Sequence, residues 1–261
     1  MSLRIGIVGL PNVGKSTLFN ALTKSGIEAE NYPFCTIDPN IGIVEVPDIR
    51  LNEINSIINT KKIINTAIEF VDIAGLVQGA SKGEGLGNKF LSNIRNVDAI
   101  IHVVRCYENE NVTHVEGSID PKRDIEIIET ELILKDIETV SKRLDKIKRE
   151  VKAGRKHDEN ELLNNLLSHL NEGQNLNKLN INHELMKELN LLTNKPILFV
   201  INVSEEDIVN PENNAALNDL HEYLNTRNEK FINICSSLEQ EISSLEKMEQ
   251  KEYLDEFGLN E

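Results

Sequence analysis

The chain has 261 residues, of which 39% are apolar and none is tryptophan, so it can form one large domain or two small ones around an aliphatic core. Its net charge of −15 disfavours non-specific coating of duplex DNA, and we expect neither sequence-specific DNA binding nor a membrane partner, because no apolar run could cross a bilayer. The three cysteines are scattered without a CxxC pair, which argues against a disulfide framework or a zinc site and favours a cytoplasmic protein.

Six short apolar runs predict the strands of a covered, mainly parallel sheet. They span residues 4–8, 41–46, 67–71, 99–105, 197–201 and 231–234. Most are separated by helix-like segments, such as 17–24 and 88–96. The alternation predicts a doubly wound α/β fold, and ligands of such sheets bind beyond the carboxyl ends of the strands.

The string GLPNVGKS, residues 9–16, follows the first predicted strand and opens the first helix. It matches the phosphate-loop pattern G-x-x-x-x-G-K-[ST] in the strand–loop–helix context that this pattern requires, and so predicts a P-loop domain that binds a nucleoside triphosphate. The glycines let backbone N–H groups turn toward an anion, and the helix start adds partial positive charge. We expect Lys15 to reach the β- and γ-phosphates and Ser16 to ligate Mg²⁺. The predicted nucleotide contacts of this segment are Asn12, Val13, Gly14, Lys15, Ser16 and Thr17.

Three further residues complete the predicted metal and γ-phosphate site. Asp72 follows the third predicted strand, where a phosphate-loop protein holds Mg²⁺, usually through water. Gly75 can let its backbone N–H approach the γ-phosphate, and Thr36 lies where a first switch loop would offer a hydroxyl to Mg²⁺. The glycine-rich segment 76–87 is costly to order, which predicts either a nucleotide switch or an ordinary flexible loop.

The middle of the chain breaks the strand–helix alternation. From about Asp124 to Lys152, apolar residues recur at spacings of three and four, as in the seam of a coiled coil. Ala153-Gly154 offers a stop, and a second leucine-rich stretch follows it. The two seams consist of Ile133, Ile137, Val140, Leu144, Ile147 and Val151, and of Leu163, Leu167 and Leu170. We therefore expect an antiparallel helical hairpin, residues 119–193, inserted into the nucleotide-binding domain, which is formed by 1–118 and 194–261.

Basic side chains gather near the predicted tip of this hairpin. They are Lys142, Arg143, Lys146, Lys148, Arg149, Lys152, Arg155 and Lys156. This is the one strongly basic stretch of an acidic chain. It predicts either a solvated coiled-coil face or a contact with RNA or another acidic partner.

The string NVSE, residues 202–205, stands where a typical GTPase carries N-K-x-D. The aspartate of that motif accepts two hydrogen bonds from guanine, whereas Glu205 is one methylene longer, and Val203 replaces the lysine that packs on the base. Adenine needs no such carboxylate, so the string predicts a preference for ATP, although a small shift of Glu205 would still admit guanine. Asn202 and the loop at Ser236 are expected to complete the base contacts.

Together these segments resemble the translation-factor class of small G domains, and in particular the YchF, or Obg-like ATPase, family. The resemblance rests on residues 9–17, 31–40, 70–91, 93–107, 120–134 and 192–205, and it covers almost the whole chain. It implies a G domain with a helical insertion, Mg²⁺-dependent ATP binding with slow hydrolysis, and association with ribosomes. Family members continue into a C-terminal TGS-type domain, to which nothing in this chain corresponds.

The catalytic groups are the least defined part of the predicted site. Many GTPases place a water-orienting glutamine directly after the residue equivalent to Gly75, but this chain has Leu76. His114 matches a histidine implicated in hydrolysis in the family; the alternative is a loop histidine without a catalytic part. We therefore predict Lys15, Gly75 and His114 as the catalytic residues. Two other functions stay open: a GTPase of the same fold, and a nucleotide-gated RNA-binding module with negligible turnover.

Overall fold

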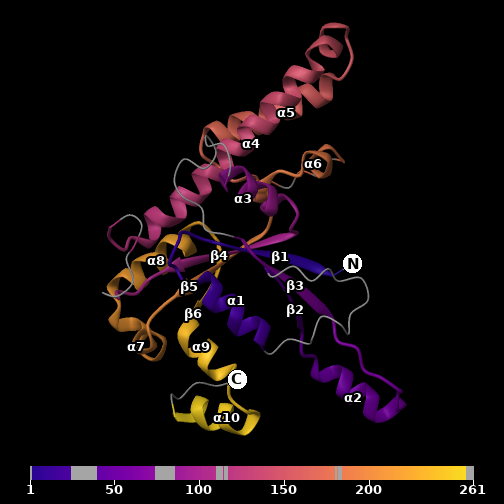
Figure 1. Ribbon diagram of the computed structural model, residues 1–261. Coiled ribbons are helices and arrows are strands. Elements are labelled where there is room, and N and C mark those ends of the chain that lie inside the picture. Colours follow the sequence, from indigo (N-terminus) through magenta and orange to yellow (C-terminus); the bar gives the residue numbers. More distant parts are fainter. Residues whose placement is uncertain are drawn as a thin grey trace.

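The computed structural model describes residues 2–24, 40–73, 86–109, 114, 117–179, 181 and 184–256, and within them six strands form one sheet (Figure 1). The strands are β1 (Leu3–Val8), β2 (Ile41–Glu45), β3 (Ala67–Asp72), β4 (Ala99–Arg105), β5 (Ile197–Asn202) and β6 (Lys230–Ile234). They lie in the order β2-β3-β1-β4-β5-β6, and all neighbours run parallel except β2 and β3. This confirms the predicted α/β class with a mainly parallel sheet.

The antiparallel pair has a simple topological cause. Between β2 and β3 the chain makes an excursion through α2 (Ile49–Ile58), which projects away from the sheet in Figure 1. The excursion returns the chain beside the strand it left, without a crossover over the sheet face, and a direct return makes neighbouring strands antiparallel.

The remaining helices flank the sheet or extend beyond it. They are α1 (Lys15–Lys24), α3 (Leu86–Arg95), α4 (Pro121–Lys152), α5 (His157–Asn171), α6 (Glu184–Leu189), α7 (Glu205–Val209), α8 (Ala215–Thr226), α9 (Ser236–Ile242) and α10 (Lys247–Glu256), with short 3₁₀ turns η2 (Leu176–Lys178), η3 (Leu192–Asn194) and η4 (Pro211–Asn213). Among these described helices, none has the length and apolar character needed to cross a bilayer.

Two apolar clusters cover the two faces of the sheet. Along β5, Val200 belongs to one cluster, whereas Phe199 and Ile201 belong to the other. Because successive side chains of a strand point to opposite faces, the two clusters together cover both faces of the sheet, and the first, which contains the consecutive residues Ile7 and Val8, itself reaches both. This double covering explains why the strands read as continuous apolar runs in the sequence.

The predicted hairpin is formed by α4 and α5, which extend away from the sheet in Figure 1. The helix α4 begins three residues before the predicted start, because the Asp120 carboxylate caps it and Pro121 fits its first turn. It ends at Lys152, and the C-cap residue Ala153 is followed by Gly154 at φ +77°. A third cluster joins the two helices and includes Val140, Ile147, Leu163, Leu166 and Leu170. In this seam Leu166 is fully buried and the predicted Leu167 only partly so.

A buried carboxylate fastens α4 to the chain segment that returns to the sheet. The side chain of Asp136 is fully buried and accepts hydrogen bonds from the backbone N–H groups of Leu192 (3.0 Å) and Thr193 (2.8 Å). The Thr193 hydroxyl donates a third bond at 2.7 Å. Burial raises the pKa of the Asp136 carboxyl, while these three donors oppose the shift. One side chain thus links the hairpin to η3, directly before β5.

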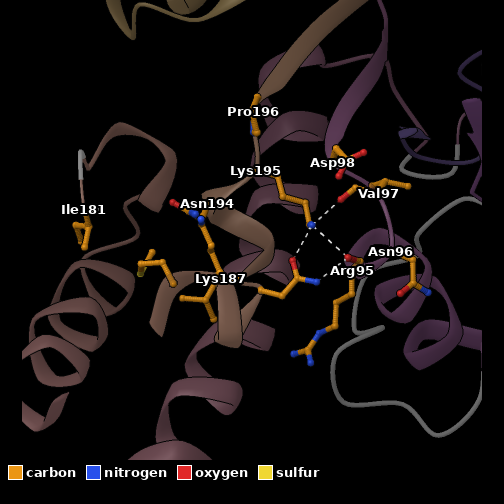
Figure 2. Close-up of a pocket in the computed structure, with 12 residues that line it drawn as sticks. Arg95, Asn96, Val97, Asp98, Ile181, Lys187, Asn194, Lys195 and Pro196 are labelled. Carbon is orange, nitrogen blue, oxygen red and sulfur yellow. Dashed lines mark hydrogen bonds between the residues drawn. The ribbon is translucent and has the colours of Figure 1, made fainter. Parts of the chain in front are cut away.

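A cavity of about 610 Å³ lies where the chain enters β4 and β5 (Figure 2). At its wall the buried Lys195 ammonium donates to the carbonyls of Arg95 (3.2 Å) and Val97 (2.6 Å) and to Oδ1 of Asn190 (2.9 Å). These bonds join the end of α3 to the end of the helical insertion. The cavity lies at the amino ends of the parallel strands, whereas the phosphate loop follows the carboxyl end of β1. We therefore assign these contacts a structural role.

Candidate nucleotide-binding site

Residues 9–14 form the turn between β1 and α1, and two glycines make its path possible. Gly9 (φ +154°) and Gly14 (φ +100°) adopt conformations that L side chains rarely take. A Cβ on Gly9 would lie 2.5 Å from the Val103 carbonyl oxygen, and one on Gly14 would lie 2.3 Å from Nδ2 of Asn202. Only glycine fits either position, so the loop packs directly against neighbouring strands.

The loop holds a buried ammonium group. Lys15 is only 7% exposed, and its Nζ donates to the Leu10 carbonyl at 2.7 Å, so the side chain folds back along the loop. Burial lowers the pKa of Lys15 to about 8, and the nearby Asp72 carboxylate opposes part of this shift. A group with this pKa is mostly charged at neutral pH. The loop therefore presents a positive charge where the sequence predicts the phosphates.

The two predicted metal ligands that the structure describes lie next to each other. The Ser16 hydroxyl on α1 donates to Oδ2 of Asp72 at 2.9 Å. The other carboxylate oxygen of Asp72 is buried without a hydrogen-bond partner among the described residues. Oxygen ligands of this kind suit Mg²⁺, and a bound hydrated cation would satisfy the buried oxygen. The other predicted ligand, Thr36, lies outside the described residues, as does Gly75.

Asn202, at the end of β5, connects the phosphate loop to the loop before α9. Its side chain is 3% exposed; Nδ2 donates to the Val13 carbonyl at 2.9 Å, and Oδ1 accepts from the Ser236 N–H at 2.9 Å. Both polar ends of the amide are thus satisfied inside the protein. The amide fixes the distance between two segments that were predicted to contact the nucleotide.

The two residues predicted to set base choice have different environments. Val203 is buried in the apolar cluster of α8, and its N–H donates to the Ile234 carbonyl at 2.8 Å. The Ser204 side chain caps α7, and Glu205 is the exposed first residue of that helix. The carboxylate of Glu205 therefore lies at the rim of the site, with an apolar side chain two residues before it.

A cavity of about 520 Å³ joins these elements. Its walls include the predicted residues Gly14, Thr17, Asn202, Val203, Glu205 and Ser236. Residues 107–109, Ser204, Glu206 and Ser237 also line it. Sequence reasoning missed the segment 107–109, which follows β4. The available signal was strand order: β4 lies beside β5, so the loops that follow them meet at one edge of the sheet.

His114 lies against the first turn of α4. Its Nε2 is 2.8 Å from Oδ2 of Asp124, and the Arg123 guanidinium contacts the other oxygen of the same carboxylate at 3.1 Å. Burial raises the pKa of the Asp124 carboxyl, while Arg123 and His114 oppose the shift. Among the described residues that line the nucleotide cavity, His114 is absent. Its catalytic role stays a prediction.

Comparison with known proteins supports the fold. Residues 4–134 fit the family model described as 50S ribosome-binding GTPase. The chain is 51% identical to the Bacillus subtilis protein named ribosome-binding ATPase YchF, over all of this chain and 73% of that relative. The Escherichia coli O157:H7 protein of the same name is 46% identical over all of this chain and 72% of its own length. The solved Schizosaccharomyces pombe YchF GTPase matches 99% of this chain and 72% of its own, with a TM-score of 0.84 at 36% identity.

Proposed function

This chain belongs to the YchF family, and we propose that it is a Mg²⁺-dependent switch protein that binds ATP in preference to GTP and hydrolyses it slowly. One observation carries the proposal. The buried Asn202 amide joins the phosphate loop to the loop at Ser236, beside a cavity whose rim carries Glu205. This arrangement can hold the phosphates and the base of one nucleotide at the same time. Slow turnover agrees with Leu76, which cannot orient water.

The described residues divide the proposed work at the phosphates. Lys15 and the loop N–H groups would stabilise the charge that develops as the bond between the β- and γ-phosphates breaks. Ser16 and Asp72, already 2.9 Å apart, would hold Mg²⁺, the carboxylate through water. Bound Mg²⁺ supplies positive charge at the β- and γ-phosphate oxygens. Thr36 and Gly75 remain the proposed further metal ligand and γ-phosphate contact.

We propose that His114 positions the attacking water. A carboxylate bonded to one ring nitrogen fixes the tautomer and the orientation of the imidazole, and Asp124 is bonded to Nε2 in this way. The pair also ties the residue to α4, the first helix of the insertion.

The preference for ATP rests on what the rim of the cavity lacks. Guanine binding would need a carboxylate on a side chain as short as that of aspartate. It would also be strengthened by a lysine stem that packs on the guanine ring. Glu205 is longer than aspartate and exposed, and the Val203 side chain is packed into the core. Adenine needs neither the aspartate carboxylate nor the lysine stem, so their absence lowers the affinity for GTP and not for ATP.

The test is titration calorimetry with non-hydrolysable ATP and GTP analogues, with and without Mg²⁺. Wild-type protein should prefer the ATP analogue, and Mg²⁺ should strengthen its binding. The variant Val203→Lys/Glu205→Asp restores N-K-x-D and should raise GTP affinity by about tenfold or more, since hydrogen bonds to charged groups contribute roughly 1.5–3 kcal/mol each.

Glu206→Asp provides the matched control, because it shortens the neighbouring carboxylate at the rim of the same cavity. This variant should leave the ratio of ATP to GTP affinity unchanged. A wild-type preference for the GTP analogue would overturn the argument from residues 202–205 and identify a GTPase of the same fold.

The second part of the proposal concerns the hairpin, which we propose is a helical insertion, residues 119–193, between the G-domain segments 1–118 and 194–261. Its basic side chains fall into two groups. Arg143 bonds Glu159 and Glu188, so it holds α5 and α6 against α4, and Lys142 and Lys156 also form ion pairs. The exposed remainder consists of Lys146, Lys148, Arg149, Lys152 and Arg155. We propose that these five form a contact with ribosomal RNA, which would place the protein with ribosomes in the cytoplasm.

The variant Lys148→Glu/Arg149→Glu/Lys152→Glu should weaken ribosome binding at least about tenfold and reduce its dependence on salt, because fewer counterions are released. ATP affinity should not change, since these residues lie outside the nucleotide cavity. Co-sedimentation with ribosomes over a range of KCl concentrations measures the effect. Lys61→Glu/Lys62→Glu/Lys230→Glu makes the same charge change on exposed residues elsewhere and should leave binding intact. Equal ribosome binding by both variants would contradict the proposed RNA contact and show that the basic tip is a solvated face.

A further inference from the structure

Arg105, the last residue of β4, is a buried arginine beside the nucleotide cavity. It is 1% exposed, and its guanidinium bonds the chain directly after the strand. Nε donates to the Tyr107 carbonyl at 3.1 Å, and Nη2 donates to the Asn109 carbonyl at 3.4 Å. The guanidinium also lies 4.7 Å from the centre of the Tyr107 ring, in the range of a cation–π contact. The Arg105 side chain therefore holds residues 107–109 in place through their backbone carbonyls and the Tyr107 ring.

The segment that Arg105 holds forms a wall of the nucleotide cavity. Residues 107–109 line that cavity together with Asn202 and the start of α7. From the other side, the Cys106 N–H donates to the Asn202 carbonyl at 2.8 Å, and β4 pairs with β5 so that Arg105 lies opposite Asn202. The segment is thus fixed both to the residue that joins the nucleotide loops and to a buried guanidinium.

The wall stands on the base and ribose side of the site. The cavity includes Gly14 and Thr17 from the phosphate-loop region but no residue from 9 to 13, and its remaining walls follow β4, β5 and β6. The phosphates are expected at the loop itself. A change in the position of 107–109 would therefore alter contacts to the nucleoside part and leave the phosphate contacts in place.

We propose that Arg105 is a positioning residue for the nucleotide: it holds residues 107–109 where they can contact the nucleoside. The inference rests on the proposed function, namely that this cavity takes a nucleoside triphosphate. Arginine suits the task because its planar fork of donors reaches two carbonyl groups while its face stacks on a ring. A lysine ammonium could satisfy only part of this arrangement, and methionine could fill the space but donate nothing.

The test compares a whole nucleotide with its phosphates alone. Binding of ATP and of inorganic tripolyphosphate, both with Mg²⁺, is measured by calorimetry for wild type, Arg105→Met and Arg105→Lys. We expect Arg105→Met to lower ATP affinity about tenfold, as lost hydrogen bonds to a charged group predict, with little change for tripolyphosphate. The ATP affinity of Arg105→Lys should lie between those of wild type and Arg105→Met. In ATPase assays KM should rise while kcat stays within about twofold of wild type.

Arg227 offers a matched control. It also contacts a tyrosine ring, that of Tyr223 at 5.0 Å, and bonds Glu129 at 2.6 Å, but it lies outside the nucleotide cavity. Arg227→Met should bind both ligands as wild type does. Three results for Arg105→Met would overturn the inference. They are equal losses of affinity for ATP and tripolyphosphate, a fall in kcat with KM unchanged, and unchanged affinity for both ligands. The proposed function fails separately, through a wild-type preference for GTP, and that result leaves this comparison intact.

Discussion

Replacing Lys15 with methionine is expected to lower the affinity for ATP by about a hundredfold at pH 7, because a charge-assisted contact to phosphate contributes up to roughly 3 kcal/mol. The variant keeps an unbranched apolar stem of similar length and removes the ammonium group. Since Lys15 is buried inside the loop, no exposed lysine can take its place without moving the chain. Calorimetry with a non-hydrolysable ATP analogue measures the loss.

The same lysine predicts a pH dependence with a definite sign. Burial lowers the pKa of Lys15 to about 8 in the free protein, whereas bound phosphates favour the charged form and raise it. Below pH 8 the group is already protonated, so affinity should be nearly constant. Above pH 8, binding must take up a proton, and ATP affinity should fall by up to about tenfold per pH unit.

This slope above pH 8 should be absent in Lys15→Met. Titrations at pH 9 in two buffers of different ionisation enthalpy should show proton uptake by wild type only. The control Lys62→Met removes an exposed lysine outside the cavity and should reproduce the wild-type curve. An affinity that stays level to pH 9.5 in wild type would contradict the assignment of Lys15 as the buried phosphate contact.

Replacing Asp136 with alanine is expected to lower the free energy of unfolding by about 3 kcal/mol or more, because three buried donors lose their acceptor and each costs roughly 1–3 kcal/mol. The donors are two backbone N–H groups and the hydroxyl of Thr193. Asp136→Asn keeps one acceptor oxygen and should lose less. Urea unfolding monitored by circular dichroism measures the difference.

Asp145 provides the control for this prediction. It lies on the same helix but is exposed, so Asp145→Ala should change stability by no more than about 0.5 kcal/mol. A loss below about 1 kcal/mol in Asp136→Ala would show that the carboxylate is not what fastens α4 to η3.

The strands could be predicted closely because a strand that is buried on both faces of a sheet has a continuous run of apolar residues in the sequence. Each predicted strand agrees with an observed strand to within one residue at either end, for instance 231–234 against Lys230–Ile234. The helix α8 carried a comparable signal that was not used: Asn214 caps it, and Leu217, Leu220 and Leu224 follow at spacings of three and four. By contrast, α2 was not predicted, although Leu51, Ile54 and Ile58 recur at spacings of three and four, and the helix buries none of its residues. The antiparallel direction of β2 depends on that excursion, and it was not predicted either.

Residues of the site were predictable where a local motif carries the chemistry. The phosphate loop and Asp72 fall into this class, because strand, turn and helix follow one another along the chain. Residues 107–109 do not, since their place depends on which strands are neighbours in space. Arg105 carried a faint signal, an arginine at the end of an otherwise apolar strand, but its hydrogen bonds to the following carbonyls cannot be read from one sequence.

The helix α4 belongs to two cores at once. Its first half supplies Ile128 and Leu132 to the cluster of the sheet, and its second half supplies Val140 and Ile147 to the cluster of the hairpin. At 32 residues it is about 48 Å long, so a tilt of about 5° at its base would move its far end by about 4 Å. A displacement in the nucleotide-binding core too small to break its packing would therefore be magnified along the helix into a larger displacement of the basic tip.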